Sequence, residues 1–414
     1  MRENILGMVG RHYDCIIIGA GPAGLFCASL LAPARVLVLE KMVLPGRKLL
    51  IAGSGQCNIT HTGDVKNFVS HYGEHGAFLR PALMAFPNTA VREFFERLGV
   101  SFVEKESGKV FPESHSADDI LDALLDACDA AGVEILSYTP AESVACENGM
   151  YAVKTLHTTY YAKALVIATG GMSYPQTGST GDGFLFAKAL GHSVTPPCPA
   201  LTPVYAVRHQ LADLSGISVY GATISIWRGG KKLLVRSGDL LITRFGYSGP
   251  VILDSARWMR TGDMLRIGFC KKKPEELDTL IRAACSSAGT KQIQNLLDDA
   301  ECPDRLVKHM VQESGIPEGT TGAQLTASQR SRLVENLTSY PVEIDHLGDF
   351  RVAMATAGGV VLDEINKKTC ESKISPGLFF IGEVLDIDGD TGGYNLQACF
   401  STAFLSAQRI RQIL

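Results

Sequence analysis

The glycine-rich hexapeptide GAGPAG at 19–24 restricts the fold of this chain more than any other feature. It follows the apolar run DCIII at 14–18 and opens a helix-like stretch at 22–32, and a second apolar run, VLVL, occupies 36–39. A strand, a tight turn, a helix and a second strand in this order predict a β-α-β unit with parallel strands. In this context the glycine spacing is the fingerprint of a dinucleotide-binding site.

Each glycine of the fingerprint has a distinct predicted role. Gly19 permits the turn, Gly21 lets a pyrophosphate approach the backbone, and Gly24 allows close packing of helix and strand. The N-terminus of the helix offers free N–H groups and partial positive charge to the phosphates. Glu40 lies 21 residues after Gly19 at the end of the second strand, where its carboxylate can accept hydrogen bonds from a ribose diol. The same carboxylate would repel a 2′-phosphate, which disfavours NADP at this site.

Three later segments favour FAD over NAD as the dinucleotide. Arg47 and Lys48 begin the stretch RKLLIAGSGQCN, where they could balance pyrophosphate charge or belong to an ordinary surface loop. The ATG triplet at 168–170 ends a further apolar run, and GEVLDIDGDTGGYNLQ at 382–397 leads from a strand into the final helix. A second helix N-terminus can therefore face the cofactor from the far end of the chain. Binding of one extended dinucleotide from both ends is more typical of FAD than of NAD.

Composition describes a globular protein of two or three domains. The 414 residues include 46% hydrophobic and 20% charged residues, which excludes disordered, collagen-like and disulfide-stapled classes. The formal net charge is −4, so the chain as a whole carries no basic field for a nucleic-acid backbone, and no nucleic-acid partner is expected. We expect a small-molecule substrate, and the oligomeric state stays open.

The sequence favours a reducing, cytoplasmic location. The start, MRENILGMVGRHYDC, lacks the basic and apolar regions of a secretory signal, and no run reaches the ~18 apolar residues typical of a membrane span. Eleven cysteines are scattered without a C-x-x-C pair. We therefore expect no membrane partner and no disulfide framework.

Changes of composition along the chain predict an interrupted α/β domain. Prolines cluster at 195–203, strand-like alternation follows at 204–269, and 274–338 is helical and charged. Glycine-rich apolar sequence returns after 345, with a final helix at 395–414. The expected domains are the first part of an FAD-binding domain at 1–194, an inserted β-rich domain at 195–269, a helical insertion and return at 270–345, and the second part of the FAD-binding domain at 346–414.

Several longer blocks resemble one known family. They include GRKLLIAGSGQCNIT at 46–60, KVFPESHSADDILDAL at 109–124, GGMSYPQTGSTGDGFLFAKALGH at 170–192, GDLLITRFGYSGP at 238–250 and GLFFIGEVLDIDGDTGGYNLQACFSTAF at 377–404. With GAGPAG they resemble the bacterial NAD(P)/FAD-dependent oxidoreductase flavoproteins, a family that includes reductases of dehydro-bile-acid intermediates. The blocks extend through nearly the whole chain and thin out between 270 and 338.

The resemblance implies a Rossmann-type FAD domain of the glutathione-reductase kind, with a β-barrel-like insertion and a small helical subdomain. It implies non-covalent FAD and NAD(P)H as a possible donor. The cofactor residues that it implies, together with those of the fingerprint, are Gly19, Ala20, Gly21, Pro22, Ala23, Gly24, Glu40, Lys41, Arg47, Lys48, Asn58, Val144, Ala168, Thr169, Gly170, Gly382, Glu383, Gly393, Tyr394, Asn395 and Leu396. The chain departs from the family pattern at Ser54, Gln56, Ala398 and Cys399.

Reduced flavin delivers hydride to a polarised double bond, and a side chain must then supply a proton. Tyr174, His115 and Cys57 are the candidates. Each also has a structural interpretation: Tyr174 as a packed turn residue, His115 as the cap of the helix near 117, and Cys57 as an inert buried thiol. The string His71-Tyr-Gly-Glu-His75 matches a zinc-ligand pattern, but Gly73 weakens the helix that this pattern needs, so no metal is expected.

The leading hypothesis is hydride transfer from flavin N5 to a conjugated C=C of a small or sterol-like substrate. An FAD-dependent amine or aminoketone oxidase that uses oxygen is the enzymatic alternative. A flavoprotein that acts on or binds RNA is a third hypothesis, which the acidic balance disfavours. A flavin-loaded redox sensor is the non-enzymatic alternative.

Overall fold

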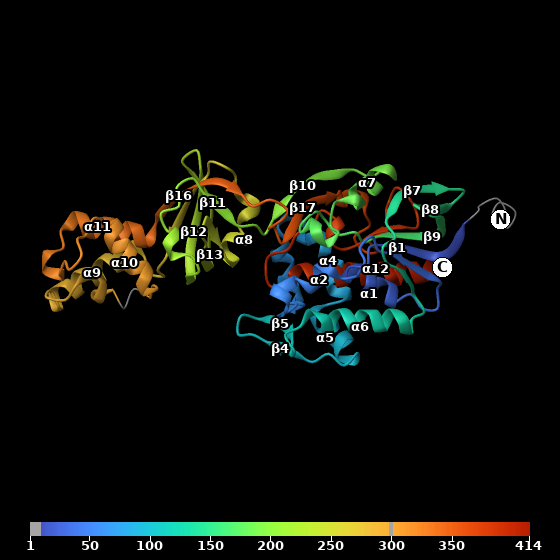
Figure 1. Ribbon diagram of the computed structural model, residues 1–414, viewed down its shortest axis with the longest axis horizontal. Coiled ribbons are helices and arrows are strands. Elements are labelled where there is room, and N and C mark those ends of the chain that lie inside the picture. Colours follow the sequence, from blue (N-terminus) through green and yellow to red (C-terminus); the bar gives the residue numbers. More distant parts are fainter. Residues whose placement is uncertain (1–9, 298–300) are drawn as a thin grey trace. The chain divides into compact units, whose positions relative to one another are not determined.

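The computed structural model describes residues 10–297 and 301–414, which divide into two compact units (Figure 1). The first unit combines the chain up to Ala200 with Ala353–Leu414, and the second is Leu201–Val352. The chain therefore leaves the first unit once and returns to complete it, so residues from both ends share one core.

A seven-stranded sheet forms the centre of the first unit, with parallel strands followed by an antiparallel meander. β1 pairs in parallel with β2 and β9, and its residues 15–18 are buried on both faces as a continuous apolar run. β18 lies parallel to β9 and brings the C-terminal part into the same sheet. The strands are, in sheet order, β6 (Glu134–Leu136), β2 (Val36–Leu39), β1 (Arg11–Ile18), β9 (Thr159–Ile167), β8 (Met150–Thr155) and β7 (Ala141–Glu147), with β18 (Leu378–Phe380) beside β9.

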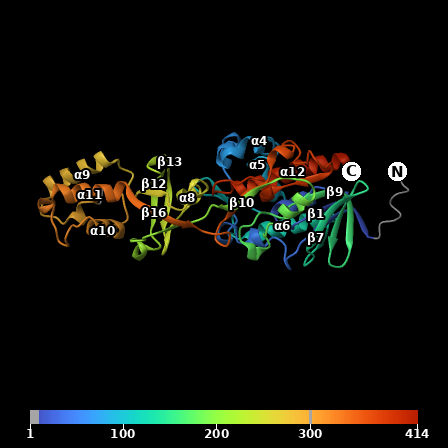
Figure 2. The same cartoon turned by 90° about the horizontal axis from the view of Figure 1, so that it is seen from above.

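Helix α1 is enclosed by helices from both ends of the chain. Phe26 of α1 meets Phe94 edge-on at 4.8 Å between ring centroids and Phe400 at 5.3 Å. This packing joins the fingerprint helix to the C-terminal helix α12 (Figure 1), which also lies against α4 and α5 (Figure 2). The helices are α1 (Pro22–Ser29), α2 (Arg47–Leu50), α3 (Val65–Phe68), α4 (Gly76–Ala85), α5 (Asn88–Arg97), α6 (Ala117–Ala130), α7 (Asp182–Ala189) and α12 (Tyr394–Ile413). Shorter strands are β3 (Thr60–His61), β4 (Phe102–Glu104), β5 (Lys109–Pro112), β10 (Val194–Ala200) and β17 (Ala355–Val360).

The second unit is a closed barrel followed by a helical group. Ile224 and Ile226 of β12 are fully buried, while the residues between them face outward, as expected for a barrel strand. The barrel strands, in order, are β11 (Val204–Ala206), β14 (Gly246–Ser248), β13 (Lys231–Ile242), β12 (Ser218–Arg228), β15 (Met264–Gly268) and β16 (Tyr340–Leu347). The helices are α8 (Pro250–Leu253), α9 (Pro274–Ser287), α10 (Asp304–Glu313) and α11 (Ala327–Thr338).

Three expected boundaries differ from the structure. The helix expected at 22–32 ends at Ser29, and β10 pairs with β17 inside the first unit, so the inserted unit begins at Leu201 rather than at 195. The strand expected to lead into the 382–397 segment ends at Phe380. Gly382 has a φ of +69°, which turns the backbone out of the extended conformation.

Two further observations concern cysteines and membrane segments. All eleven cysteines are free thiols. Within 10–297 and 301–414, no helix combines the length and the apolar composition needed to cross a membrane.

The packing of α1 gives a test of the fingerprint glycines. A Cβ on Gly24 would lie 2.0 Å from the Gly19 carbonyl oxygen, whereas a Cβ on Gly21 would meet no atom within 4 Å. We expect Gly24→Ala to lower the unfolding free energy of the cofactor-free protein by about 1–3 kcal/mol, because backbone must move to relieve the clash. Gly21→Ala should cost at most about 1 kcal/mol. Denaturant titration compares the two variants, and equal losses would contradict the packing role.

Candidate cofactor-binding site

The fingerprint turn leaves one open position above the backbone. Gly19 has a φ of +108°, and a Cβ there would lie 2.5 Å from the carbonyl oxygen of Ala168, the residue that follows β9. Gly24 packs against Gly19, as described above, while the space over Gly21 is empty. Gly21 is also the N-cap of α1 and provides no side-chain cap. The turn therefore offers room and uncapped N–H groups for a phosphate, the arrangement expected of a pyrophosphate site.

Glu40 lies directly beside this turn. Its carboxylate accepts hydrogen bonds from Ala20 N at 2.9 Å and from Met42 N at 2.8 Å. Each carboxylate oxygen keeps a further lone pair, so Glu40 can still accept from a ribose diol. Lys41, in contrast, pairs with Asp182 at 2.6 Å, which assigns it a structural contact with α7. Val144 is buried in β7, as expected for a strand after a helix.

A second segment is anchored to the fingerprint turn. Gly46 N donates to Ala20 O at 2.9 Å, which places the short helix α2 beside the turn. Arg47 is exposed there, in reach of solvent and of a bound anion. Lys48 instead forms a 2.6 Å ion pair with Glu383, which leaves Arg47 as the exposed cation of this segment.

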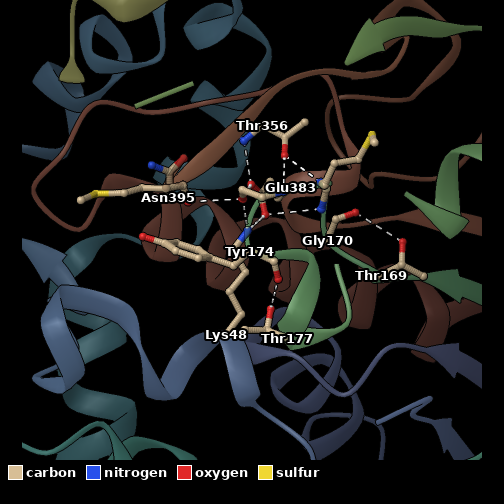
Figure 3. A network of polar contacts seen from close by, with 12 residues as sticks. Lys48, Thr169, Gly170, Tyr174, Thr177, Thr356, Glu383 and Asn395 are labelled. Atoms are coloured by element: carbon tan, nitrogen blue, oxygen red, sulfur yellow. Dashed lines mark hydrogen bonds and ion pairs between the residues drawn. The ribbon is translucent and has the colours of Figure 1, made fainter. Parts of the chain in front are cut away.

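The Lys48–Glu383 pair is the centre of a polar network (Figure 3). Glu383 also accepts from the Ser173 hydroxyl at 3.1 Å and from Thr356 N at 2.8 Å. The Thr356 hydroxyl in turn accepts from Met172 N at 2.8 Å. Ser173 and Thr356 were missed in the sequence, because each looks like an ordinary small polar residue until the chain folds.

The last helix begins in the same region. Gly393, the N-cap of α12, has a φ of +95°, and a Cβ there would lie 2.6 Å from the Thr60 carbonyl oxygen. The side-chain amide of Asn395 closes the preceding loop. Its Oδ1 accepts from Gly389 N at 2.8 Å, and its Nδ2 donates to Gly389 O at 3.0 Å. The side chain of Tyr394 is buried and that of Leu396 is partly buried. The groups available to a cofactor in this segment are therefore those of the backbone.

The remaining predicted cofactor positions lie on neighbouring turns. Ala168 N donates to Ile18 O at 2.9 Å, which holds the 168–170 turn next to the end of β1. Gly170 has a φ of +71°, and a Cβ there would lie 3.7 Å from Glu383 Oε2. The Asn58 amide oxygen accepts from Val110 N at 3.2 Å. Together these contacts gather the predicted segments from both chain ends around one region of the first unit.

The three weak catalytic candidates are placed differently. Tyr174 lies beside the Lys48–Glu383 pair in a turn with φ +52°, and burial raises the pKa of its phenol (Figure 3). Burial raises the pKa of the Cys57 thiol to about 12, which fits an inert cysteine. His115 is exposed, and the cap of α6 is Ser116, whose hydroxyl accepts from Asp118 N at 3.2 Å. The capping role considered for His115 is therefore wrong.

Two histidine–carboxylate pairs border the loop between Glu383 and α12. His71 Nδ1 lies 3.2 Å from Asp390 Oδ2, and His75 Nδ1 lies 3.7 Å from Asp386 Oδ1. The His71 ring also stacks on Tyr394 at 4.0 Å between centroids. The segment 69–75 is a kinked 3-10 helix with Gly73 at φ +54°, and no cluster of three metal-ligating side chains occurs among the described residues. The two histidines of the 71–75 string thus each pair with an aspartate of the loop before α12, which the zinc pattern did not predict.

These observations meet the requirements of an extended dinucleotide. Two helices, α1 and α12, begin at glycines that provide no side-chain cap. The open space over Gly21, the free acceptor capacity of Glu40 and the exposed cation of Arg47 fit a pyrophosphate and its ribose. The residues present therefore fit FAD.

Known proteins with similar sequences span almost the whole chain. The chain is 32% identical over 410 residues to the ribosomal RNA dihydrouridine synthase of Escherichia coli (strain K12), covering 96% of this chain and 98% of that protein. It is 31% identical to the protein of the same name from Haemophilus influenzae, covering 97% and 99%. It is 28% identical to the 3-dehydro-bile acid delta(4,6)-reductase of Clostridium scindens, covering 95% and 97%.

Solved structures share the fold at low sequence identity. An open flavocytochrome c3 fumarate reductase matches with a TM-score of 0.53 and 15% identity, over 99% of this chain and 80% of that one. A 3-ketosteroid delta1-dehydrogenase from Sterolibacterium denitrificans matches with a TM-score of 0.53 and 13% identity, over 98% and 100%. The family described as HI0933-like protein Rossmann domain matches residues 13–409. The chain therefore belongs to the HI0933-like Rossmann family of FAD-dependent oxidoreductases.

Proposed function

We propose that this protein uses FAD to saturate a carbon–carbon double bond conjugated to a carbonyl group. The observation that carries the proposal is the pairing of His71 with Asp390 on the loop that joins Glu383 to the start of α12. This loop connects two predicted cofactor contacts, so an oriented imidazole lies beside the region where we expect the flavin. Reduction of a double bond requires such a proton source next to a hydride source.

The names of the similar proteins support the same chemistry. A dihydrouridine synthase and a delta(4,6)-reductase both add two hydrogens to a carbon–carbon double bond. In uracil and in a conjugated steroid ketone alike, that double bond is conjugated to a carbonyl. The shared reaction class is therefore a firmer basis for the proposal than either substrate.

FAD, when bound, would supply a hydride to one carbon of the double bond. Electron density then builds on the neighbouring carbon, next to the carbonyl, and this carbon takes a proton. In the proposal His71 gives that proton, and Asp390 orients the ring. The product gains one hydride and one proton, and His71 takes a proton back from solvent, since its side chain is 37% exposed.

NADH or NADPH is proposed as the source of electrons for the next turnover. The chain has no second GxGxxG after a further strand–helix unit, so the nicotinamide would bind without this fingerprint. The nicotinamide donor is proposed from the resemblance. Reduction of the flavin by this donor can be measured separately from reduction of the substrate by the flavin.

The direct test of the proposed function is an anaerobic half-reaction. The flavin is reduced with NADH or NADPH and then mixed with a conjugated steroid ketone or with uridine-containing RNA. We expect the oxidised flavin spectrum to return while the substrate gains two hydrogens by mass. Flavin that ignores both substrates but reoxidises rapidly in oxygen with formation of peroxide would instead identify an oxidase.

Removal of the lysine of the central ion pair should weaken cofactor binding. Lys48→Ala leaves Glu383, whose side chain is 14% exposed, without its cation and loosens the link between the two chain ends. We expect the Kd for FAD to rise about 10- to 100-fold, equal to about 1.4–2.8 kcal/mol. The matched control is Arg409→Ala, which breaks a 2.9 Å pair with Glu371 near the other end of α12. Equal losses of FAD affinity would show that the effect is general destabilisation.

Replacement of the proposed proton donor should slow only the reduction of substrate. We expect His71→Gln to lower the rate of flavin reoxidation by substrate about 100-fold or more, the usual contribution of general acid catalysis. FAD content and the rate of flavin reduction should stay near wild type. His75→Gln is the matched control, because His75 has the same chemistry at a longer distance from its carboxylate. A larger loss in the control would assign the proton to His75.

A further inference from the structure

Two cysteines of the second unit meet where β15 ends. Cys270 follows β15, and Cys302 precedes the proline at which α10 begins. Cys302 Sγ donates to the carbonyl oxygen of Phe269, the neighbour of Cys270, at 3.3 Å. The next residues along each segment are also paired, since Lys271 Nζ lies 3.3 Å from Glu301 Oε2. Two separate contacts therefore hold the segments 269–271 and 301–302 side by side, with one cysteine in each.

The two thiols also interact directly. The hydrogen bond with Cys302 is the largest of the effects that lower the pKa of the Cys270 thiol. Burial opposes this effect, while backbone hydrogen bonds and the positive charge of Lys272 lower the pKa further. The same hydrogen bond between the thiols raises the pKa of Cys302. Negative charge on the pair is therefore held by Cys270, and a thiolate is the reactive form of cysteine.

Other neighbouring cysteines of the chain have a different environment. Cys27, Cys128 and Cys370 lie in the core of the first unit, and burial raises the pKa of each. A thiol that is both protonated and shielded from solvent reacts slowly with oxidants. Cys302, in contrast, is partly exposed, and both side chains of the adjacent ion pair are exposed. A small oxidant can therefore reach the Cys270–Cys302 pair from solvent.

We propose that Cys270 and Cys302 form a site of reversible oxidation, at which hydrogen peroxide converts the two thiols into a disulfide. The Cys270 thiolate attacks one peroxide oxygen, the O–O bond breaks, and the other oxygen leaves as hydroxide, which leaves a sulfenic acid on Cys270. The Cys302 sulfur then attacks the Cys270 sulfur, the S–O bond breaks, and the oxygen leaves as water. In total the two thiols lose two electrons and two protons, and one peroxide becomes two molecules of water.

The disulfide ties the start of α10 to the end of β15. It closes a covalent loop of residues 270–302 that contains α9, and such a loop restricts the unfolded chain. In a reducing compartment the pair stays as two thiols, as it does in the structure, and a dithiol reverses the oxidation. The site is independent of the proposed double-bond reduction, because both cysteines belong to the second unit and neither is assigned to the cofactor.

Thiol counting tests the disulfide. The FAD-loaded full chain is treated with hydrogen peroxide, denatured in an alkylating reagent and measured by mass. We expect the number of alkylated thiols to fall from eleven to nine and to return to eleven with dithiothreitol. Trypsin should release peptide 267–271 linked to peptide 292–305, each of which contains one cysteine. Peroxide-treated protein in which both peptides stay alkylated would overturn the inference.

Serine variants test the order of the steps. In Cys302→Ser we expect a sulfenic acid on Cys270 that a dimedone reagent traps, because no second thiol resolves it. Cys285→Ser is the matched control, since Cys285 is a partly exposed thiol of the same unit whose pKa burial raises. The control should form the disulfide at the rate of the unmodified chain, and its failure to do so would overturn the pairing. Equal trapping on Cys302 in Cys270→Ser would overturn the assignment of Cys270 as the reacting thiolate.

The rate of oxidation should depend on the charge beside Cys270. We expect Lys272→Gln to shift the pH profile of this rate to higher pH, because the positive charge of Lys272 favours the thiolate. Lys291→Gln makes the same change at an exposed lysine of the second unit and should leave the profile unchanged. Equal profiles for the two variants would overturn the thiolate mechanism.

Thermal unfolding tests the covalent tie. We expect peroxide to raise the Tm of the second unit by roughly 5 °C or more, and dithiothreitol to reverse the rise. Cys270→Ser should show no rise. A Tm that stays constant although the linked peptides are present would overturn the inference that the disulfide restrains the unit. None of these readouts uses the reduction of a substrate, so the proposed function can fail or hold separately.

Discussion

The ion pair between Lys48 and Glu383 joins segments that are 335 residues apart, and the candidate site depends on this junction. Lys48 belongs to the segment anchored beside the fingerprint turn, and Glu383 precedes the loop that leads into α12. Each of the two residues belongs to one of the segments that make up the candidate cofactor-binding site. Both side chains are largely removed from solvent, so the pair requires further hydrogen bonds to offset the loss of hydration. Ser173 and Thr356 provide them to Glu383.

The same junction explains why acid–base groups gather here. The loop after Glu383 contains three buried aspartates, Asp386, Asp388 and Asp390. Buried carboxylates require hydrogen bonds or positive partners, and the nearby 3-10 helix provides His71 and His75. Asp390 N also donates to His71 O at 2.8 Å, so backbone and side chain hold the two segments together. The need of the buried carboxylates for partners therefore places the imidazoles of His71 and His75 next to the candidate cofactor-binding site.

Local pattern was sufficient where the structure is determined by neighbours in sequence. The β-α-β order was predicted, and the strand Val36–Leu39 has the predicted bounds, because apolar runs and glycine turns act within a few residues. Thr356 and Ser173 are 183 residues apart, and their contact follows from the return of the chain into the first unit. The pairing of His71 with Asp390 has the same origin, and the spacing of the two histidines pointed to zinc instead. Prediction from local sequence also failed at the start of α6, where the N-cap is Ser116 and not His115.

The distribution of charge follows from the same division of the chain. Net charge is a property of the whole polypeptide, whereas a ligand senses only the groups near it. In the first unit, the buried or partly buried carboxylates Glu40, Glu383 and Asp390 each have a partner. In the second unit, Lys232 lies over the ring of Trp227 at 5.5 Å and Arg236 over that of Trp258 at 5.0 Å. The net charge of the whole chain therefore does not determine the charge that surrounds any one of these groups.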